Sequence, residues 1–327
     1  MSANYPLDVY FYEAFEEEWQ QIIAYLPLNI KTGHTWKTIQ EATDNQPPAP
    51  LISTRTQTII PESWLTQIKG LLTRSTGFDY FQQLRKKAPA NVQFGYLPLY
   101  CNRSVAEQAL LLWLALMRKL PKQTLQFQTF NRDGLTGRES MGKTLLIVGV
   151  GNIGYEIVKI GWGLAMTVLG VDIVKKHDDV NYVDFDETLP QADIIVSAMN
   201  LTPENTDYFK YQRLKTAKRG AIFVNIARGE QSYPSALKRL LDEQILGGVA
   251  LDVYPFENKL GSALRGNLAI EDSELKIIKL LAQYPNVILT PHNAFNTEES
   301  VQRKSEQSVQ QIVNFLETGK FIWDVPE

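Results

Sequence analysis

Three polar side chains, Arg228, Glu257 and His292, stand in segments that follow short apolar runs in the second half of the chain. A histidine suits general acid–base work because its unperturbed pKa of about 6.5 lies near neutrality. A carboxylate beside it raises that pKa and fixes the ring tautomer, and Glu257 fits this role. A guanidinium offers a planar fork of donors that can anchor a substrate carboxylate, and Arg228 fits that role. The three side chains are therefore candidates for hydride transfer at a carbon that carries a hydroxyl or oxo group.

A glycine-rich turn lies between an apolar strand-like run and a helix expected over 155–164. Gly149 permits a tight turn, Gly151 lets a pyrophosphate approach the backbone, and Gly154 lets the helix pack close to the strand. A second apolar run ends at Asp172, whose carboxylate can accept hydrogen bonds from both hydroxyls of an adenosine ribose. This arrangement predicts that the chain binds a dinucleotide.

The choice between NAD and NADP rests on the residues at the end of that second run. Asp172 favours NAD, because a carboxylate repels the 2′-phosphate of NADP. Lys175 and Lys176 follow it and could contact such a phosphate, so NADP stays an alternative.

These side chains need a scaffold of alternating strands and helices, which the rest of the chain provides. In the second half, nearly continuous apolar runs are typical of buried parallel strands, and they cover 144–148, 167–171, 194–198, 221–225, 248–251 and 287–290. In the first half, strands are expected over 8–12, 51–54, 68–73 and 92–96, with helices over 16–25, 62–67 and 81–87. A long helix is expected over 104–120, with Ser104 as its N-cap, and a last helix over 298–318.

This alternation predicts an α/β protein with two doubly wound parallel-sheet domains. A Rossmann NAD-binding domain over 103–295 would be inserted into a flavodoxin-like substrate domain built from 1–102 and 296–327. Ligands of such sheets bind at the carboxyl ends of the strands, where the candidate side chains lie.

Size and composition limit the class of protein. The chain has 327 residues and a net charge of −3, without a block of lysines and arginines that would indicate nucleic-acid binding. The single cysteine, Cys101, excludes an intrachain disulfide and fits a reducing cytoplasm. The most apolar stretch, 109–117, is too short to cross a membrane, which takes about 20 residues. With only three histidines, a metal site is not expected.

Together, these segments resemble the D-isomer-specific 2-hydroxyacid dehydrogenase family, and most closely its D-lactate dehydrogenase-like branch. The motifs that carry the resemblance are the glycine turn with the preceding 140–144, and the segments 201–206, 225–229, 251–254 and 290–292. The resemblance implies that Arg228 binds substrate, that Glu257 supports His292, that His292 is the acid/base, and that Asp252 lies near the nicotinamide. Further cofactor contacts are expected from residues in or next to these motifs, namely Asn152, Ile153, Asn200, Thr206 and Ala227.

The first domain carries a second set of matching positions. The segment 74–79 resembles the family's loop whose backbone N–H groups hold the substrate carboxylate, which places Thr76 and Gly77 at the substrate. In the D-lactate dehydrogenase-like branch, a tyrosine at the position of Tyr100 points toward the substrate. Arg55, at an expected strand end, is a candidate for a second anionic contact.

The resemblance has departures. The family usually has an apolar pair and an aspartate after the segment that ends at Glu230, whereas this chain has Gln231, Ser232, Tyr233 and Pro234. These departures weaken the transfer of a substrate preference from relatives.

The sequence thus favours an NAD-dependent oxidoreductase, acting as a homodimer, that interconverts a 2-oxo acid and the (R)-2-hydroxy acid. Two alternatives stay open. One is an oxidoreductase of the same fold for another small acid, such as phosphoglycerate or phosphite. The other is a non-catalytic NAD(H)-sensing interaction protein, as some relatives of the family are.

Overall fold

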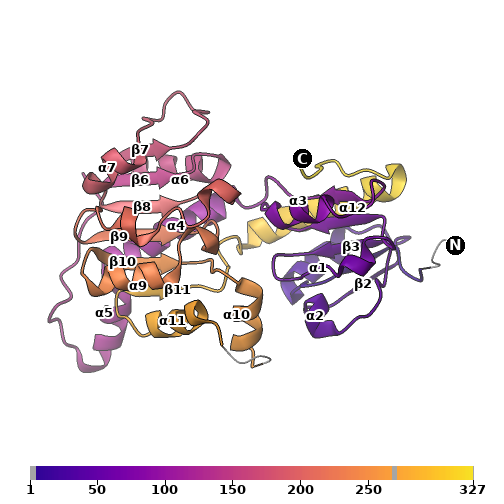
Figure 1. The fold of residues 1–327 in the computed structure, drawn as a ribbon, viewed down its shortest axis with the longest axis horizontal. Helices are drawn as coiled ribbons and strands as arrows, with labels where there is room; N and C mark the ends of the chain where they lie inside the picture. The colour runs from indigo at the N-terminus through magenta and orange to yellow at the C-terminus, as the bar shows by residue number, and fades with distance from the viewer. Residues whose placement is uncertain (1–4, 267–270, 327) are drawn as a thin grey trace. The chain divides into compact units, whose positions relative to one another are not determined.

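The computed structural model describes residues 5–266 and 271–326. The chain divides into two compact units, the first formed by Met1–Cys101 with Asn296–Glu327 and the second by Asn102–Phe295 (Figure 1). The sequence placed the first change of domain one residue later, after position 102.

Unit 1 is built on a five-stranded parallel sheet with the order β2-β1-β3-β4-β5. Because the chain order reverses between β1 and β3, this is the flavodoxin-like arrangement that the sequence predicted. The strands are β1 (Val9–Phe11), β2 (Thr32–His34), β3 (Leu51–Thr54), β4 (Gly70–Thr73) and β5 (Gln93–Gly95). The edge strand β2 was not expected, since its three residues include a glycine and a histidine and show no apolar run.

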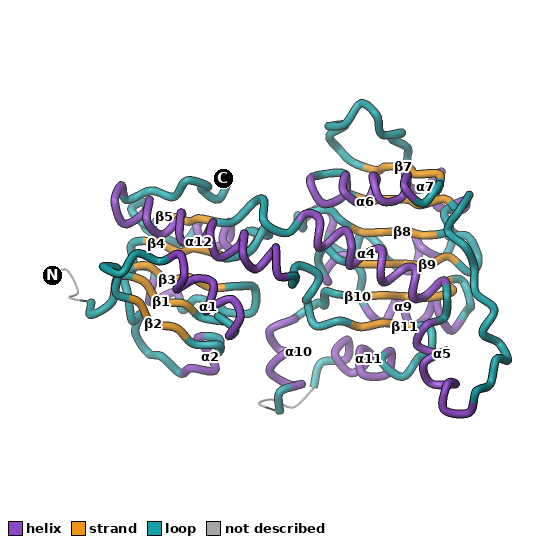
Figure 2. The backbone as a smooth tube through the Cα atoms, turned by 180° about the vertical axis from the view of Figure 1, so that it is seen from behind, coloured by secondary structure: helices purple, strands orange, loops and turns teal. Residues whose placement is uncertain are grey.

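Helices cover both faces of the unit 1 sheet. On one face, α1 (Glu16–Tyr25) packs along α12 (Glu298–Thr318), and both helices have the predicted bounds (Figure 2). On the other face, an apolar cluster joins the sheet to shorter elements, which are α2 (Ile39–Ala42), η1 (Glu62–Trp64) and α3 (Asp79–Arg85). The helix expected over 62–67 is only this 3₁₀ turn η1, because the chain must turn at once into β4.

Unit 2 is built on a six-stranded parallel sheet with the order β11-β10-β9-β8-β6-β7. The strands are β6 (Thr144–Val148), β7 (Thr167–Val171), β8 (Ile194–Ser197), β9 (Ala221–Asn225), β10 (Leu246–Leu251) and β11 (Val287–Leu289). An isolated parallel bridge joins Gly170 of β7 to Tyr182. With that bridge as a reduced outer strand, the order is that of a Rossmann fold, which reverses between β6 and β8.

The two faces of the unit 2 sheet also carry helices. In Figure 2, α4 (Asn102–Met117) and α6 (Asn152–Gly163) lie against one face, and in Figure 1, α9 (Pro234–Asp242) and α11 (Ser273–Leu281) lie against the other. The remaining helices are α5 (Leu120–Gln126), η2 (Phe127–Thr129), α7 (Phe185–Thr188), η3 (Leu189–Gln191), η4 (Pro203–Asn205), α8 (Tyr211–Leu214), η5 (Gly229–Gln231) and α10 (Glu257–Leu264).

Two expected helix starts were wrong. Ser104 is not an N-cap, because α4 begins at Asn102 and Ser104 is buried inside its first turn. Helix α6 begins at Asn152, three residues earlier than expected, so that the last glycine of the turn lies in the helix itself. The glycine pattern hid this start, since glycine is a poor helix former in general.

Over the described residues, the structure has no helix that is both long enough and apolar enough to cross a bilayer.

Candidate active site

The glycine turn connects β6 to α6 at the point where the strand order of unit 2 reverses. Gly149 has a φ of +95°, and a Cβ there would lie 2.5 Å from the backbone nitrogen of Met199. A Cβ at Gly154 would lie 1.9 Å from the carbonyl oxygen of Gly149. At Gly151, in contrast, a Cβ would meet nothing within 4 Å. Two glycines therefore permit close packing, and the third leaves open space beside the start of α6.

Asp172 follows β7 and folds back onto the glycine turn. One carboxylate oxygen accepts the N–H of Val150 at 2.6 Å, and the other accepts the N–H of Val174 at 2.9 Å. Since each carboxylate oxygen has two lone pairs, both keep the capacity to accept a ribose hydroxyl. Asp172 thus holds the backbone of the glycine turn in place. Its contact with an adenosine ribose stays a prediction.

The segment after β8 carries Asn200 and Thr206, which are both exposed. The carbonyl oxygen of Asn200 accepts hydrogen bonds from the side chains of Asn205 and Gln231, at 2.6 and 3.1 Å. The Thr206 hydroxyl donates to the carbonyl oxygen of Thr202 at 3.2 Å. This segment is therefore held by side-chain contacts to its backbone, and its two expected cofactor residues point away from the core.

Strands β9, β10 and β11 end side by side, because Leu251 of β10 pairs with Asn225 on one side and with Leu289 on the other. The three segments that follow these strands carry Arg228, Glu257 and His292. The parallel sheet therefore brings together three residues that are far apart in the sequence, as was predicted from their positions after apolar runs.

The segment that carries Arg228 is shaped by the buried amide of Asn225. The Asn225 side chain accepts the N–H of Ala227 at 3.0 Å and donates to the carbonyl oxygen of Arg228 at 2.9 Å. The next residue, Gly229, packs against the segment after β10, and a Cβ there would lie 1.9 Å from the carbonyl carbon of Tyr254. Only glycine allows this approach of two backbones, which holds Arg228 near the segment that carries Glu257.

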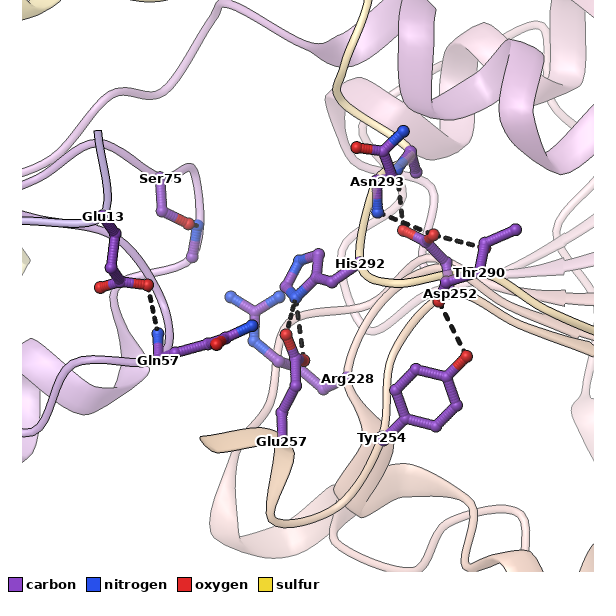
Figure 3. A network of polar contacts seen from close by, with 12 residues as sticks. Glu13, Gln57, Ser75, Arg228, Asp252, Tyr254, Glu257, Thr290, His292 and Asn293 are labelled. Atoms are coloured by element: carbon purple, nitrogen blue, oxygen red, sulfur yellow. Dashed lines mark hydrogen bonds and ion pairs between the residues drawn. The ribbon is translucent and has the colours of Figure 1, made fainter. Parts of the chain in front are cut away.

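The segment that carries His292 is held by the carboxylate of Asp252, which is fully buried at the end of β10. One of its oxygens accepts the Thr290 hydroxyl at 2.5 Å and the Asn293 N–H at 2.9 Å, and the other accepts the Ala294 N–H at 2.9 Å. These three bonds surround His292, which has a left-handed backbone conformation with a φ of +50°. Figure 3 shows this network beside the histidine ring.

His292 and Glu257 form a close pair. The Nδ1 atom of His292 lies 2.7 and 2.9 Å from the two carboxylate oxygens of Glu257, and Figure 3 shows the Arg228 guanidinium beside the same ring. The pair is partly exposed, with 22% of the His292 side chain and 18% of the Glu257 side chain accessible. A bond from Nδ1–H to the carboxylate leaves Nε2 of the ring for proton exchange with a ligand.

The surroundings of His292 favour its protonated form. Burial alone lowers the pKa of His292, and Arg228 acts in the same direction. The carboxylate of Glu257 opposes both through charge and hydrogen bonding, with a smaller contribution from Asp252, so that the pKa of His292 is raised above its usual 6.5. A histidine with a raised pKa is suited to donate a proton near neutral pH.

The expected substrate residues of unit 1 lie at the carboxyl ends of its strands. After β4, the Thr76 hydroxyl lies 3.3 Å from the Cys101 sulfur, and the N–H of Gly77 donates to the Ser75 hydroxyl at 3.1 Å. After β3, Arg55 is half-buried and lies over the ring of Phe15, 5.4 Å from its centroid.

Tyr100 differs from these three residues, because only 5% of it is exposed. Its carbonyl oxygen accepts the Ser300 hydroxyl at 3.2 Å and the Arg303 guanidinium at 2.9 Å. Burial also raises the pKa of the Tyr100 phenol, which stays protonated. Direct contact of Tyr100 with a substrate stays a prediction.

The residues present fit a bound dinucleotide. The free space at Gly151 lies at the first turn of α6, whose N–H groups and dipole attract phosphate. Gly151, Asn152 and Ile153 would hold the pyrophosphate, and Asp172 the adenosine ribose. Contact of Asn200, Thr206 and Ala227 with the cofactor stays a prediction.

Sequence reasoning missed the buried residues that hold the backbone of these segments in place but are not expected to contact a ligand. Gln231 is fully buried and joins two strand ends, since it accepts the Ser197 hydroxyl at 2.9 Å and donates to the carbonyl oxygens of Met199 and Asn200 at 3.1 Å. The departure of this position from the family's apolar pair was a usable signal, because a polar residue at an apolar position must find partners.

Comparison with known proteins agrees with this geometry. Residues 110–294 match the family described as "D-isomer specific 2-hydroxyacid dehydrogenase, NAD binding domain". A D-lactate dehydrogenase of Streptococcus agalactiae serotype V is 32% identical over 259 residues, which cover 77% of each chain. An aromatic 2-oxoacid reductase of Clostridium sporogenes is 30% identical over 255 residues, which cover 76% of each chain.

A solved structure is also similar to this fold. The D-lactate dehydrogenase of Aquifex aeolicus, crystallised with NAD and lactic acid, superposes with a TM-score of 0.83 at 26% identity, covering 98% of this chain and 100% of the other.

The sheet of unit 2 has a dinucleotide-binding turn, and the segments after its strands carry a histidine–carboxylate pair and an arginine. Together, these features define a nicotinamide-dependent oxidoreductase. The chain belongs to the D-isomer-specific 2-hydroxyacid dehydrogenase family. It is an NAD-dependent enzyme of that family, and residues 110–294 form its NAD-binding domain.

Proposed function

We propose that this enzyme reduces a 2-oxo acid to the (R)-2-hydroxy acid, and catalyses the reverse reaction, with His292 as the acid/base. The observation that carries the proposal is the double contact of Nδ1 of His292 with Glu257 at 2.7 and 2.9 Å, beside Arg228. The relatives named above are D-lactate dehydrogenases and a 2-oxoacid reductase, which supports the same reaction class.

Each residue has a defined task in the proposed reduction. NADH, when bound, would supply a hydride for C2 of the substrate. Protonated His292 donates its Nε2 proton to the former oxo oxygen, and Glu257 keeps the ring oriented and stabilises its charge. Arg228 polarises the oxo group and binds the substrate carboxylate with its fork of donors.

The N–H groups of Thr76 and Gly77 are proposed to hold the same carboxylate from unit 1. The remaining assignments also stay proposals, with Asp252 near the nicotinamide and Tyr100 and Arg55 near the substrate. Residues 1–101 and 296–327 would thus form the substrate domain.

The direct test measures NADH oxidation with a panel of 2-oxo acids, for the wild type and His292→Ala. We expect turnover of at least one 2-oxo acid to the (R)-product, and a loss of kcat of at least about 100-fold in the variant. A near-normal rate for His292→Ala would remove His292 from the mechanism.

The same panel separates the alternatives. Turnover of phosphoglycerate or phosphite, but of none of the 2-oxo acids, would identify an oxidoreductase for another small acid. Tight NADH binding without turnover of any acid would favour an NAD(H)-sensing protein.

We also propose that the enzyme is a homodimer. Large apolar side chains are exposed on α5, on η2 and just after it, including Leu125 at 68%, Phe127 at 75% and Phe130 at 71%. Apolar surface of this kind is typical of an interaction site. Light scattering on the purified enzyme should give twice the chain mass, and Phe127→Ser with Phe130→Ser should lower it to one chain.

A cytoplasmic location is proposed from the single buried cysteine, which excludes an intrachain disulfide. Cell fractionation with an activity assay tests it.

A further inference from the structure

Unit 2 has a cavity at the amino-terminal ends of its strands. Its volume is about 400 Å³, which lies within the range of about 300–1,000 Å³ that is typical of ligand pockets. One wall consists of Gly220 before β9, Gly247 of β10 and Asn286 before β11. The other wall consists of the end of α4 and part of the connecting segment, which is defined here as residues 118–143 between α4 and β6. All of these residues belong to unit 2.

This cavity lies at the edge of the sheet that is opposite to the candidate active site. Arg228, Glu257 and His292 follow β9, β10 and β11, whereas the cavity residues precede or begin the same three strands. Figures 1 and 2 both show α5 at one end of these strands and α10 at the other. Since β9 has five residues, it spans about 16 Å. The cavity is therefore separate from the glycine turn and from the histidine–carboxylate pair.

The charged residues that line the cavity are all cations. Lys119, Lys122 and Arg138 contribute to its walls, and none of its described lining residues is an aspartate or a glutamate. Nζ of Lys119 donates to the carbonyl oxygen of Gly134 at 2.9 Å. Lys122 and Arg138 are half-buried, and over residues 5–266 and 271–326 their head groups have no ion pair or hydrogen bond. The cavity thus holds two cations whose charge the described chain does not pair.

The connecting segment is basic as a whole. It carries six lysines and arginines and only two acidic residues, Asp133 and Glu139, although the complete chain has a net charge of −3. Neither Asp133 nor Glu139 lines the cavity. Positive charge is therefore concentrated around this cavity, where it would attract an anion.

The end of α4 offers another explanation for these cations, since the negative end of a helix dipole attracts positive charge. However, the last carbonyl oxygens of α4 already have backbone partners. The carbonyl oxygens of Leu116 and Met117 accept the N–H groups of Lys119 and Arg138, at 3.1 and 2.9 Å. The head groups of Lys122 and Arg138 are thus not needed to satisfy the helix end.

Close backbone contacts fix the shape of the cavity. A Cβ at Gly137 would lie 2.6 Å from the carbonyl oxygen of Met117, and a Cβ at Gly247 would lie 2.6 Å from that of Gly220. The side-chain amide of Asn286 donates to the carbonyl oxygen of Gly247 at 3.1 Å. Because backbone groups hold both walls, the cavity exists before a ligand binds.

The two unpaired head groups lie at different walls. A Cβ at Gly134 would lie 2.6 Å from Nζ of Lys122, so this ammonium packs on the backbone of the connecting segment. A Cβ at Gly220 would lie 4.0 Å from Nη1 of Arg138, so this guanidinium is near the sheet edge. A ligand that binds both must therefore offer acceptors in more than one direction.

Phosphate groups meet this requirement better than carboxylates. A phosphate monoester carries a charge of about −1.5 to −2 near neutral pH and three acceptor oxygens, whereas a carboxylate carries one charge and two oxygens in one plane. An arginine binds phosphate with its planar fork of donors, and a lysine binds it as a point charge. Arg138 and Lys122 supply one donor of each kind.

We propose that this cavity is a second anion-binding site of the enzyme, and that Lys122 and Arg138 bind a small molecule with two or more phosphate groups there. Lys119 adds its charge from the same wall as Lys122. The ligand is neither substrate nor cofactor, because the cavity lies at the other edge of the sheet. The proposal does not depend on which acid the enzyme reduces.

The experiment measures the binding of inorganic pyrophosphate to the whole enzyme by isothermal titration calorimetry. Saturating NADH keeps the glycine turn occupied. We expect one site per chain, with a Kd that rises with salt concentration because the cations are half-exposed. Lys122→Met and Arg138→Met should each raise the Kd about 10-fold, as expected for the loss of a hydrogen bond between charged groups. Arg138→Lys, which keeps the charge, should raise it less.

Two control variants locate the bound anion. Lys86→Met replaces an exposed lysine of unit 1, and Arg228→Leu removes the candidate substrate anchor, and both should keep the wild-type Kd. Without pyrophosphate, Lys122→Met and Arg138→Met should keep the wild-type kcat/KM and circular dichroism spectrum. A loss of binding in Arg228→Leu would place the anion in the candidate active site and overturn the proposal.

Three further results would contradict the proposed site. If the wild type does not bind pyrophosphate, or if the combined variant of Lys122→Met and Arg138→Met binds it equally well, the cavity is not a phosphate site. Equally tight binding of citrate would show that the site does not select phosphate groups. If the combined variant instead has a lower mass in light scattering and the wild type binds no pyrophosphate, the two cations serve contact with a second copy of the chain.

Discussion

The two units use buried polar residues in different ways at the same edge of a parallel sheet. In unit 2, Asp252 and Asn225 bond mainly to backbone groups of the segments that carry His292 and Arg228. In unit 1, Glu18 bonds instead to charged side chains of other elements. Unit 2 thus holds the backbone of its candidate site in place, where small displacements matter for chemistry, whereas unit 1 joins separate elements through paired buried charges.

The largest effect is expected where two backbones touch. Gly229→Ala would place a Cβ 1.9 Å from the carbonyl carbon of Tyr254, and neither backbone can yield as a flexible side chain would. The segment with Arg228 must then move away from the segment with Glu257. Since a displacement of about 1 Å can cost about 100-fold in rate, we expect kcat/KM for the preferred 2-oxo acid to fall at least that far.

A glycine in open space controls for the loss of backbone freedom. At Gly163, at the end of α6, a Cβ would meet nothing within 4 Å. Gly163→Ala should therefore keep the wild-type kcat/KM, and circular dichroism should show both variants folded. Equal rates for the two variants would contradict the role given to the close contact.

The next effect concerns the His292–Glu257 pair and depends on pH. Glu257→Gln removes the charge that raises the pKa of His292, while burial and Arg228 continue to lower it. Because reduction needs protonated His292, the alkaline fall of kcat/KM should move to lower pH by about one unit or more, with a loss of about 10-fold near pH 7. A pH profile that keeps its wild-type alkaline limb would show that Glu257 does not act on the acid/base.

The same pair contributes to stability with a defined sign. The folded-state pKa of His292 is raised above that of the unfolded chain. The stability that His292 contributes is therefore complete below its unfolded-state pKa of about 6.5, and it is lost as the pH rises through its folded-state pKa. Urea unfolding of the wild type and Glu257→Gln should differ most at acidic pH, as long as Glu257 is ionised.

A smaller effect is expected at Gln231, which joins the segment after β8 to the segment with Arg228. Gln231→Leu leaves the carbonyl oxygens of Met199 and Asn200 and the Ser197 hydroxyl without these partners. Each such loss costs about 1–3 kcal/mol when the group stays buried. We expect the KM for NADH to rise about threefold to tenfold, because Asn200 belongs to the expected cofactor contacts.

Unit 1 offers a matched control for Gln231. Gln311 is also fully buried and donates to two backbone carbonyl oxygens, those of Tyr96 and Trp323, at 2.8 and 2.9 Å. Gln311→Leu should lower the free energy of unfolding by a similar amount and leave the KM for NADH unchanged. If both variants raise that KM alike, general loosening rather than local positioning explains the effect.

The sequence predicted more of unit 2 than of unit 1. All six strands of unit 2 are apolar runs and were found, and the segments that follow the last three carry Arg228, Glu257 and His292. Strand β2 and the outer bridge at Tyr182 were missed because edge segments need no apolar run. The charges around Glu18 were missed for another reason, since Arg74 and Lys304 are 230 positions apart in sequence and neither lies in an apolar pattern.

The smallest effect at neutral pH is expected for the buried charges of unit 1, which are Glu18, Arg74 and Lys304. Replacing Lys304 by methionine removes a buried ammonium but leaves Glu18 paired with Arg74, so the free energy of unfolding at pH 7 should stay within about 1 kcal/mol of the wild type. This contrasts with unit 2, where each loss of a buried polar group leaves a partner unsatisfied.

The pH dependence of that variant tests the ionisation of Lys304 directly. The pKa of Lys304 is about 7 in the folded chain, against its usual value of 10.5. Between these two pKa values, Lys304 holds its proton in the unfolded chain but not in the folded one. The free energy of unfolding of the wild type should therefore rise with pH, and Lys304 should contribute up to about 1.4 kcal/mol per pH unit to this rise. Lys304→Met removes this rise, which urea unfolding at pH 7, 8 and 9 would reveal as a smaller slope. Parallel slopes for both proteins would mean that Lys304 keeps its proton throughout, because Glu18 alone then compensates its charge.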